Sequence, residues 1–552
     1  MVNERFSRPG PLIVLLGTGF LLLMLTGSLT DGSGARIGLR LSFGNDAAIQ
    51  ERPDGLQIVL PRGAATMTYT TNGDVPTPGS PTLMTEQEVG QVFRRWSLVP
   101  TSLQWRRPID GHQPAWVIRV ASFNDRGDPL EQVSRTVLPP NDHGLRVCSL
   151  ILPPGAFFDP DTGIYVIGNR ILDQDAEDVV QYPEDHRWWK YPGNYLGRGR
   201  DWERTAVLEM SDGEGAMLGS WNVGVRIHGN NTRGFAQHAL RILFKDPVDV
   251  PLVHGDDRGG YAAVVLRAGG NDQGDAFIRD LLQHRACSGS SFETIQGVPV
   301  VLYVNGEFWG IHNLRHRLDD EELARRHHVE AKGFDIVEDR LISYRGAASA
   351  PRDLGRMVAW AGALDPSDPV SYEKLDRHID MDGMAAYLAS QLCLGNADWP
   401  AQNVRCYRWT GARDSLVPAL DGRWRFMMGD SDQGLGYVNG PEHDDLADLL
   451  NDQAPFPRLF SYCLRMERFR AQVREHVLRM TEGSLSEGRL LALIDGLQED
   501  LAPVMERHAR RWHRPVSKAH WEQELQRLRE HVRRRVPYMI EQARNDFPAL
   551  RP

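Results

Sequence analysis

The chain has 552 residues, of which 41% are hydrophobic and 25% are charged, and its formal net charge is -10. This length exceeds what one hydrophobic core accommodates, so we expect two or three domains. The composition excludes a largely disordered chain. The negative charge argues against a general nucleic-acid binder, because short basic runs such as Arg533–Arg535 do not offset it.

The N-terminus carries the features of an export signal. Arg5 and Arg8 precede an apolar run from Leu12 to about Leu25. Two fates stay open: a cleaved signal peptide, or a single N-terminal membrane anchor, since Leu12–Leu29 is nearly long enough to span a bilayer. We therefore predict a signal peptide or anchor over residues 1–36 and an extracytoplasmic protein, secreted or anchored.

The spacing of short strand-like runs over residues 37–140 predicts a β-sandwich. Short strand-like runs at Leu56–Leu60, Thr66–Thr70 and Trp116–Ala121 are separated by Gly, Pro, Asn and Asp. The segments Tyr69–Pro78 and Ile118–Phe123 resemble the Ig-like domain at the C-terminus of chitobiases and hexosaminidases. That resemblance implies an accessory module, either a spacer or a surface that contacts glycan or envelope.

The pattern over residues 141–440 predicts mixed strands and helices, and residues 441–552 are predicted to be helical nearly throughout. Strands are expected at 223–228 and 240–244, with a hairpin over 300–309 that turns at Asn305-Gly306. Helices are expected at Asp319–His328 and Met384–Leu394.

One constellation has the residue types that phosphoryl transfer needs. Asp398 and Asn403 have the D-x-x-x-x-N spacing with which protein kinases supply an Asp for the attacking hydroxyl and a carboxamide for metal. An apparent strand ending at Met428 then leads to Asp430 and Asp432. From spacing alone, a metal site and a set of capping and turn residues are both open readings.

Several motifs in order resemble the CotH (spore coat protein H) kinase family, over about residues 148–545. They are Phe157–Asn169, Val225–Arg233, Asn305–Ile311, Asn396–Asn403 and Asp430–Asp432. The family implies an atypical kinase fold that uses ATP and Mg²⁺ or Mn²⁺ to phosphorylate Ser or Thr of exported proteins. By motif, Asp398 is the catalytic Asp, and Asn403 and Asp430 bind metal, with Asp432 a second metal candidate.

Two positions depart from the family pattern. His238 stands where a Lys is expected, and His316 stands where a Glu is expected. If the two positions face each other, the change removes an ion pair that steadies phosphate binding. Arg241 and Arg233 are candidates to supply the missing positive charge, and a metal site formed by His238 and His316 is another open reading. Arg226, like the other two arginines, is a candidate to bind phosphate, with surface salt-bridging as the alternative.

The sequence thus predicts a multidomain protein: an N-terminal β-sandwich, then an α+β atypical protein-kinase-like fold with a helical C-terminal lobe. The predicted function is an exported ATP-dependent protein kinase, impaired if the two histidines weaken phosphate binding. The alternative is a pseudokinase or envelope-binding scaffold. Arg279 and Asp280 are interpreted as a structural ion network.

Overall fold

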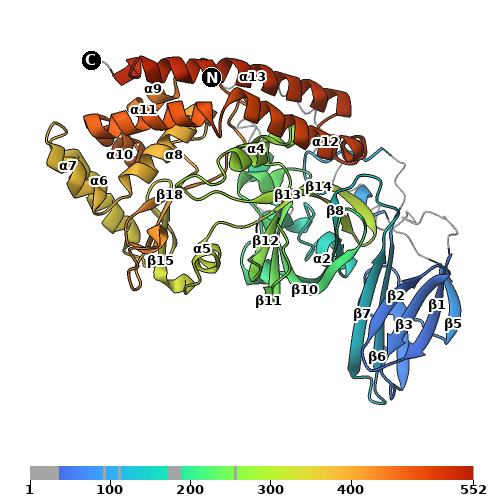
Figure 1. Cartoon of the computed structure of the whole chain (residues 1–552). Helices are drawn as coiled ribbons and strands as arrows, with labels where there is room; N and C mark the ends of the chain where they lie inside the picture. The colour runs from blue at the N-terminus through green and yellow to red at the C-terminus, as the bar shows by residue number, and fades with distance from the viewer. Residues whose placement is uncertain are drawn as a thin grey trace. The chain divides into compact units, whose positions relative to one another are not determined.

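The computed structural model describes residues 36–90, 95–109, 114–171, 188–253, 256 and 258–550, so the apolar segment Leu12–Leu29 lies outside the described residues. The chain divides into two compact units (Figure 1). The first comprises residues 1–99 and 116–135, and the second comprises 100–115 and 136–552. Residues 100–115, predicted to be in the β module, therefore belong to the second unit.

The first unit is rich in β-structure, as predicted. One sheet has the strand order β2-β3-β1-β5 and another the order β4-β6-β7. In β3, Leu56, Ile58 and Leu60 are buried while the residues between them are partly exposed, which is the alternation of a strand with one face in a core. The bounds are β1 (Arg36–Phe43), β2 (Ala48–Arg52), β3 (Gly55–Leu60), β4 (Thr66–Thr70), β5 (Glu86–Gly90), β6 (Trp116–Phe123) and β7 (Pro129–Val137).

The second unit begins with a closed barrel of order β10-β11-β12-β14-β13-β8-β9. The predicted hairpin is present as β13 and β14, and its turn residues Asn305 and Gly306 both have positive φ, as a tight hairpin turn requires. The bounds are β8 (Arg146–Ile151), β9 (Arg204–Ser211), β10 (Met217–His228), β11 (Ala239–Val248), β12 (Tyr261–Arg267), β13 (Gly297–Val304) and β14 (Glu307–Arg315).

A second sheet, of order β16-β15-β17-β18, follows in the chain. Val404 of β17 pairs with Met428 of β18, so the residues just outside this pair, Asn403 and Gly429, are held side by side. The bounds are β15 (Phe334–Glu338), β16 (Ile342–Arg345), β17 (Val404–Trp409) and β18 (Arg425–Met428).

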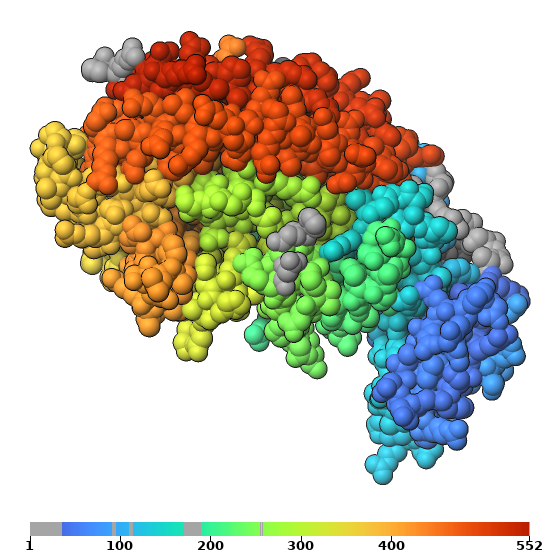
Figure 2. All heavy atoms as spheres, in the orientation of Figure 1, coloured from blue at the N-terminus to red at the C-terminus, as the bar shows by residue number. Residues whose placement is uncertain are grey.

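Helices complete the second unit. The predicted helices are found as α5, capped by Asp319, and α8, which is buried almost all round. Helices α11–α13 form a continuous layer in the space-filling view (Figure 2). The bounds are α2 (Pro154–Phe158), α4 (Arg279–Ala286), α5 (Asp320–His327), α6 (Ala350–Ala363), α7 (Pro369–Asp376), α8 (Met381–Leu394), α9 (Asp445–Asn451), α10 (Pro455–Leu464), α11 (Glu467–Glu482), α12 (Glu487–Trp512) and α13 (Lys518–Arg544).

The C-terminal helices share one hydrophobic core with the preceding elements. Leu281 of α4, Ile311 of β14 and Met384 of α8 lie in the same buried cluster as Leu501 of α12 and Leu528 of α13. The predicted border at residue 440 therefore does not divide this core. In the part of the chain that the structure describes, no helix combines the length and apolarity needed to cross a membrane.

Candidate functional site

Polar side chains from two predicted motif segments, Asn396–Asn403 and Asp430–Asp432, meet beyond the ends of α8, β17 and β18. The Asp398 carboxylate accepts hydrogen bonds from Gln433 Nε2 at 2.6 Å and from Asn403 Nδ2 at 3.4 Å. Asn396 donates through Nδ2 to the backbone oxygen of Asp430 at 3.1 Å, and its Oδ1 accepts from the Asp398 N–H at 3.3 Å. The predicted residues Asp398, Asn403 and Asp430 therefore lie in one hydrogen-bonded group.

Backbone geometry fixes this group. Helix α8 ends at Gly395 in the left-handed conformation, which turns the chain toward Asn396. Asn403 also has positive φ, 62°, a conformation that Asn adopts more readily than most residues. A Cβ on Gly429 would lie 2.7 Å from the Asn403 backbone oxygen, so only glycine permits this approach.

Burial raises the pKa of Asp398 from its ordinary value of 3.8 to about 6. The nearby charge of Asp430 adds to this effect, and the hydrogen bond from Asn403 opposes it. A carboxylate with a pKa of about 6 is a better proton acceptor than an ordinary Asp and is still mostly ionised at pH 7.

Arg267, at the end of β12, joins the acidic residues from the other side. Its Nη2 lies 2.6 Å from Asp430 Oδ1 and 2.7 Å from Asp432 Oδ2, and its Nε lies 3.6 Å from Asp280. Burial works against the guanidinium charge, but the three carboxylates outweigh it and raise the pKa of Arg267. Asp280 also binds Arg315, which confirms its place in an ion network.

Both oxygens of Asp432 are already occupied. Oδ2 accepts from Arg267 and from the Asn271 N–H at 2.7 Å, and Oδ1 accepts from Asn271 Nδ2 at 3.1 Å. Gly270 has a φ of 66°, and a Cβ there would lie 1.9 Å from Asp432 Oδ2. Asp432 therefore fastens the segment after β12 to the site.

The arginines predicted to bind phosphate differ in what they contact. Strand register places Arg226 opposite Arg241, and Arg241 opposite Val265. Opposed residues point to the same face, and Arg267 follows Val265 by two, so all three arginines share one face of the barrel. Arg226 pairs with Glu203 at 2.8 Å, whereas Arg241 makes no hydrogen bond or ion pair with any residue that the structure describes.

Arg241 is thus a partly buried cation that forms no hydrogen bond or ion pair with a described residue, although the charge of Asp319 acts on it and raises its pKa. Burial and the neighbouring Arg317 lower the pKa of Arg241 overall, which means that the surroundings disfavour its charged form. Arg241 and Arg267 are diagonal neighbours on the paired strands β11 and β12, so their Cα atoms lie about 7–8 Å apart. An anion bound at Arg241 would therefore lie on the same face as the acidic group.

Arg233 and His238 belong to the core. Arg233 donates to four backbone carbonyls at 2.6 to 2.9 Å. The fully buried His238 ring lies 4.4 Å from the ring of Tyr165 and 5.2 Å from that of Tyr195, measured between centroids. Burial lowers the pKa of His238 to about 3, so this side chain is neutral at pH 7.

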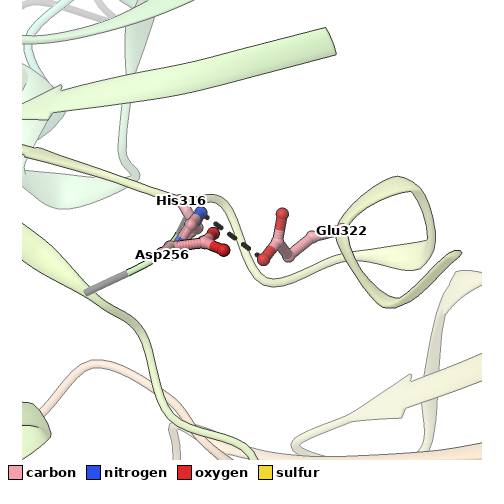
Figure 3. Close-up of side chains that lie close together, drawn as sticks. All are labelled: Asp256, His316 and Glu322. Atoms are coloured by element: carbon pink, nitrogen blue, oxygen red, sulfur yellow. Dashed lines mark ion pairs between the residues drawn. The ribbon is translucent and has the colours of Figure 1, made fainter. Parts of the chain in front are cut away.

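His316 lies in a buried ion cluster (Figure 3). Its Nε2 is 3.3 Å from Asp256 Oδ2, and its Nδ1 is 3.4 Å from Glu322 Oε1. Arg325 bridges the same two carboxylates, and Arg326 also donates to Glu322. Both carboxylates are therefore already compensated by guanidinium groups, which disfavours a further cation.

The hypothesis that His238 and His316 face each other is wrong. Through β12, the register places Leu240 of β11 level with Leu314 of β14. His238 is therefore level with His312, four residues from His316, or about 13 Å along a strand. The two histidines form neither a contact nor a joint metal site.

Sequence reasoning missed Arg267, although a signal was available. A charged residue ends the apolar strand Tyr261–Leu266 and is followed by Gly269-Gly270. A buried strand that ends in a charge before two glycines indicates a close approach of backbone to other groups. Two of its partners, Asp430 and Asp432, could not be read from the sequence, because they lie more than 160 residues later.

Comparison with known proteins adds a family assignment to this geometry. No curated protein matches the chain. The model of the family described as CotH kinase protein matches residues 225–539, a span that holds Arg226, Arg267, Asp398, Asn403 and Asp430. The match covers more than half of the chain. The chain belongs to the CotH kinase protein family.

Proposed function

We propose that the chain is an atypical protein kinase that transfers phosphate from ATP to Ser or Thr hydroxyls of exported proteins. The observation that carries this proposal is the group formed by Asp398, Asn403 and Asp430, with the unpartnered Arg241 on the barrel face that also holds Arg267. Protein kinases need these same elements: an Asp at the hydroxyl, hard oxygen ligands for metal and a cation for phosphate.

The residues present fit a divalent metal. Asn403 and Asp430 offer the oxygen ligands that Mg²⁺ or Mn²⁺ prefers, and Asp430 is partly exposed while Asp432 is buried with both oxygens occupied. We therefore assign metal binding to Asn403 and Asp430, and a positioning role to Asp432. When bound, the metal supplies charge neutralisation for the phosphates.

Asp398 is assigned to the hydroxyl of the substrate. Its raised pKa suits the acceptance of a proton, and Gln433 and Asn403 hold its carboxylate in place. Arg241 is assigned to the phosphates, in the role for which a Lys was expected at position 238. His238, Arg233 and His316 lie outside this assignment, because each has core or ion-network partners.

Location and partners complete the proposal. The basic flank and apolar run at the N-terminus support export, with the chain secreted or held by one N-terminal anchor. The kinase substrate is then an exported protein. The β-rich first unit is proposed as an accessory module of the chitobiase-like type that contacts glycan or envelope, with no nucleic acid involved.

The experiment is label transfer by the full chain from γ-labelled ATP with Mg²⁺ or Mn²⁺. The Asp398→Ala variant is expected to bind nucleotide but to lose phosphate transfer, whereas the Asp430→Ala variant is expected to lose metal-dependent nucleotide binding. Arg241→Gln removes hydrogen bonds to charged phosphate, each worth about 1.5–3 kcal/mol, and is expected to weaken nucleotide affinity about 10–100-fold. Arg533→Gln, an exposed arginine on α13, is the matched control.

A second candidate, a pseudokinase scaffold, is favoured by one observation. Arg267 already neutralises Asp430 and Asp432, whose carboxylates a bound metal ion would otherwise neutralise. Metal-dependent nucleotide binding without label transfer supports this candidate. Absence of metal-dependent nucleotide binding refutes the kinase proposal and the metal assignment to Asn403 and Asp430.

A further inference from the structure

Two clusters in the described chain bring together one His, one Asp and one Glu at metal-ligand spacing: Asp256–His316–Glu322 and Asp275–His520–Glu524. The first is buried and is bridged by Arg325, so a metal would have to displace a bound guanidinium. The second is accessible from solvent. The side chains of Asp275 and His520 are 37% and 32% exposed.

The second cluster has the geometry of a metal site. His520 Nε2 lies 3.7 Å from Asp275 Oδ1. One ligand atom from each of Asp275, His520 and Glu524 lies within 4.8 Å of the other two. Ligand atoms around a tetrahedral zinc ion lie about 3.3 Å apart, because each is about 2.0 Å from the metal. Asp275 and His520 are partly exposed, so small rotations of these two side chains would bring their ligand atoms to that spacing from Glu524.

Two elements that are already fastened together carry the ligands. His520 and Glu524 are four residues apart on α13, so they project from the same side of the helix. Asp275 ends the short turn at Gly270–Gly274, and the next residue, Ala276, accepts a hydrogen bond from Trp521 Nε1 at 2.8 Å. The ligand framework is therefore held before any metal arrives.

The charges of the cluster are only partly compensated. Asp275 forms no ion pair with a described residue other than His520. Glu524 is buried, with a side chain that is 9% exposed, and it pairs with Arg527, which is 58% exposed. Asp275 and His520 thus face solvent, and Glu524 lies behind them with one cation at its carboxylate.

We propose that Asp275, His520 and Glu524 bind a transition-metal ion of the zinc class, with water at the fourth position. One imidazole with two carboxylates is a donor set that suits Zn²⁺, whereas Mg²⁺ prefers oxygen alone. The ion clamps the turn that carries Asn271, whose two hydrogen bonds hold Asp432. Metal at this position stabilises the loop beside the phosphoryl-transfer site without taking part in transfer.

The test uses the EDTA-treated full chain, titrated with Co²⁺ in the presence of excess Mg²⁺, which fills oxygen-only sites. We expect one equivalent of Co²⁺ with visible absorption of four-coordinate geometry, displaced by Zn²⁺, and a rise in Tm when Zn²⁺ is added. His520→Gln is expected to lose the absorption and the Tm rise. The affinity loss should exceed the roughly 10–100-fold that removal of an outer-shell partner costs.

His443→Gln is the matched control, because His443 is also partly exposed and paired with an Asp, Asp448, but belongs to neither three-residue cluster. This control should bind Co²⁺ as the unchanged chain does. Equal Co²⁺ binding by His520→Gln, or no Co²⁺ absorption in the unchanged chain, overturns the proposal. Neither result depends on whether the protein transfers phosphate.

Discussion

Replacing Arg267 by Met tests whether one guanidinium holds the acidic residues together. The Arg267 side chain is 9% exposed and contacts Asp280, Asp430 and Asp432. Removing one partner of a buried ion pair costs about 3–5 kcal/mol, because the remaining charge loses its compensation. We expect Arg267→Met to lower the free energy of unfolding by about 3 kcal/mol, the lower end of this range. The reason is that Asp280 and Asp432 keep other hydrogen-bond donors.

The assay is thermal unfolding of the full chain at pH 7.5. At about 2 °C per kcal/mol for large domains, Arg267→Met should lower the Tm of the second unit by about 6 °C. Arg267→Lys keeps the charge but loses the planar fork, so its Tm should fall less. A Tm for Arg267→Met within 1 °C of that of the unchanged chain would refute the reasoning.

The pH dependence gives a second check on the same variant. Burial disfavours the charged form of Asp280, but Arg267 and Arg315 outweigh it and lower the pKa of its carboxyl below 3.8. Because the pKa of Asp280 is lower in the folded state than in the unfolded state, its ionised carboxylate stabilises the fold above about pH 4. This stabilisation is lost progressively as the pH falls below about 4. The Tm difference between the unchanged chain and Arg267→Met should therefore narrow below about pH 4.

Three further outcomes are expected. The rate of label transfer should fall below about pH 6, where Asp398 becomes protonated, and Asp398→Asn should lower the rate about 10²–10⁴-fold, as measured in a pH–rate profile. His238→Lys places a charge against Tyr165 in the core and should lower Tm without strengthening nucleotide binding by calorimetry. Gly270→Ala sets a Cβ 1.9 Å from Asp432, so reduced metal-dependent nucleotide binding is expected, and unchanged binding would contradict the close approach.

Local patterns predicted the elements well where one residue type decides the conformation. The Asn305-Gly306 hairpin, helix α5 and strand β10 follow from turn residues, capping and alternation, all of which act within a few residues. The D-x-x-x-x-N spacing likewise placed Asp398 and Asn403 together, because both flank one short loop.

Contacts between distant segments were beyond these patterns. Arg233 was predicted to bind phosphate or to form a salt bridge, yet its N–H groups donate to backbone carbonyls of two separate segments. The register of β11, β12 and β14 sets the separation of His238 and His316, and no local feature encodes that register. For the same reason the unpartnered state of Arg241 emerges only from the assembled barrel.

The pairing of β17 with β18 has a practical consequence. Four residue pairs, from Val404–Met428 to Tyr407–Arg425, fix the separation of Asn403 from Gly429 whatever the length of the connection at the other end. In that connection Leu416 is 90% exposed. A peptide tag or a fluorescent label inserted beside Leu416 would therefore report on the protein in its compartment while leaving the spacing of the two motif segments unchanged.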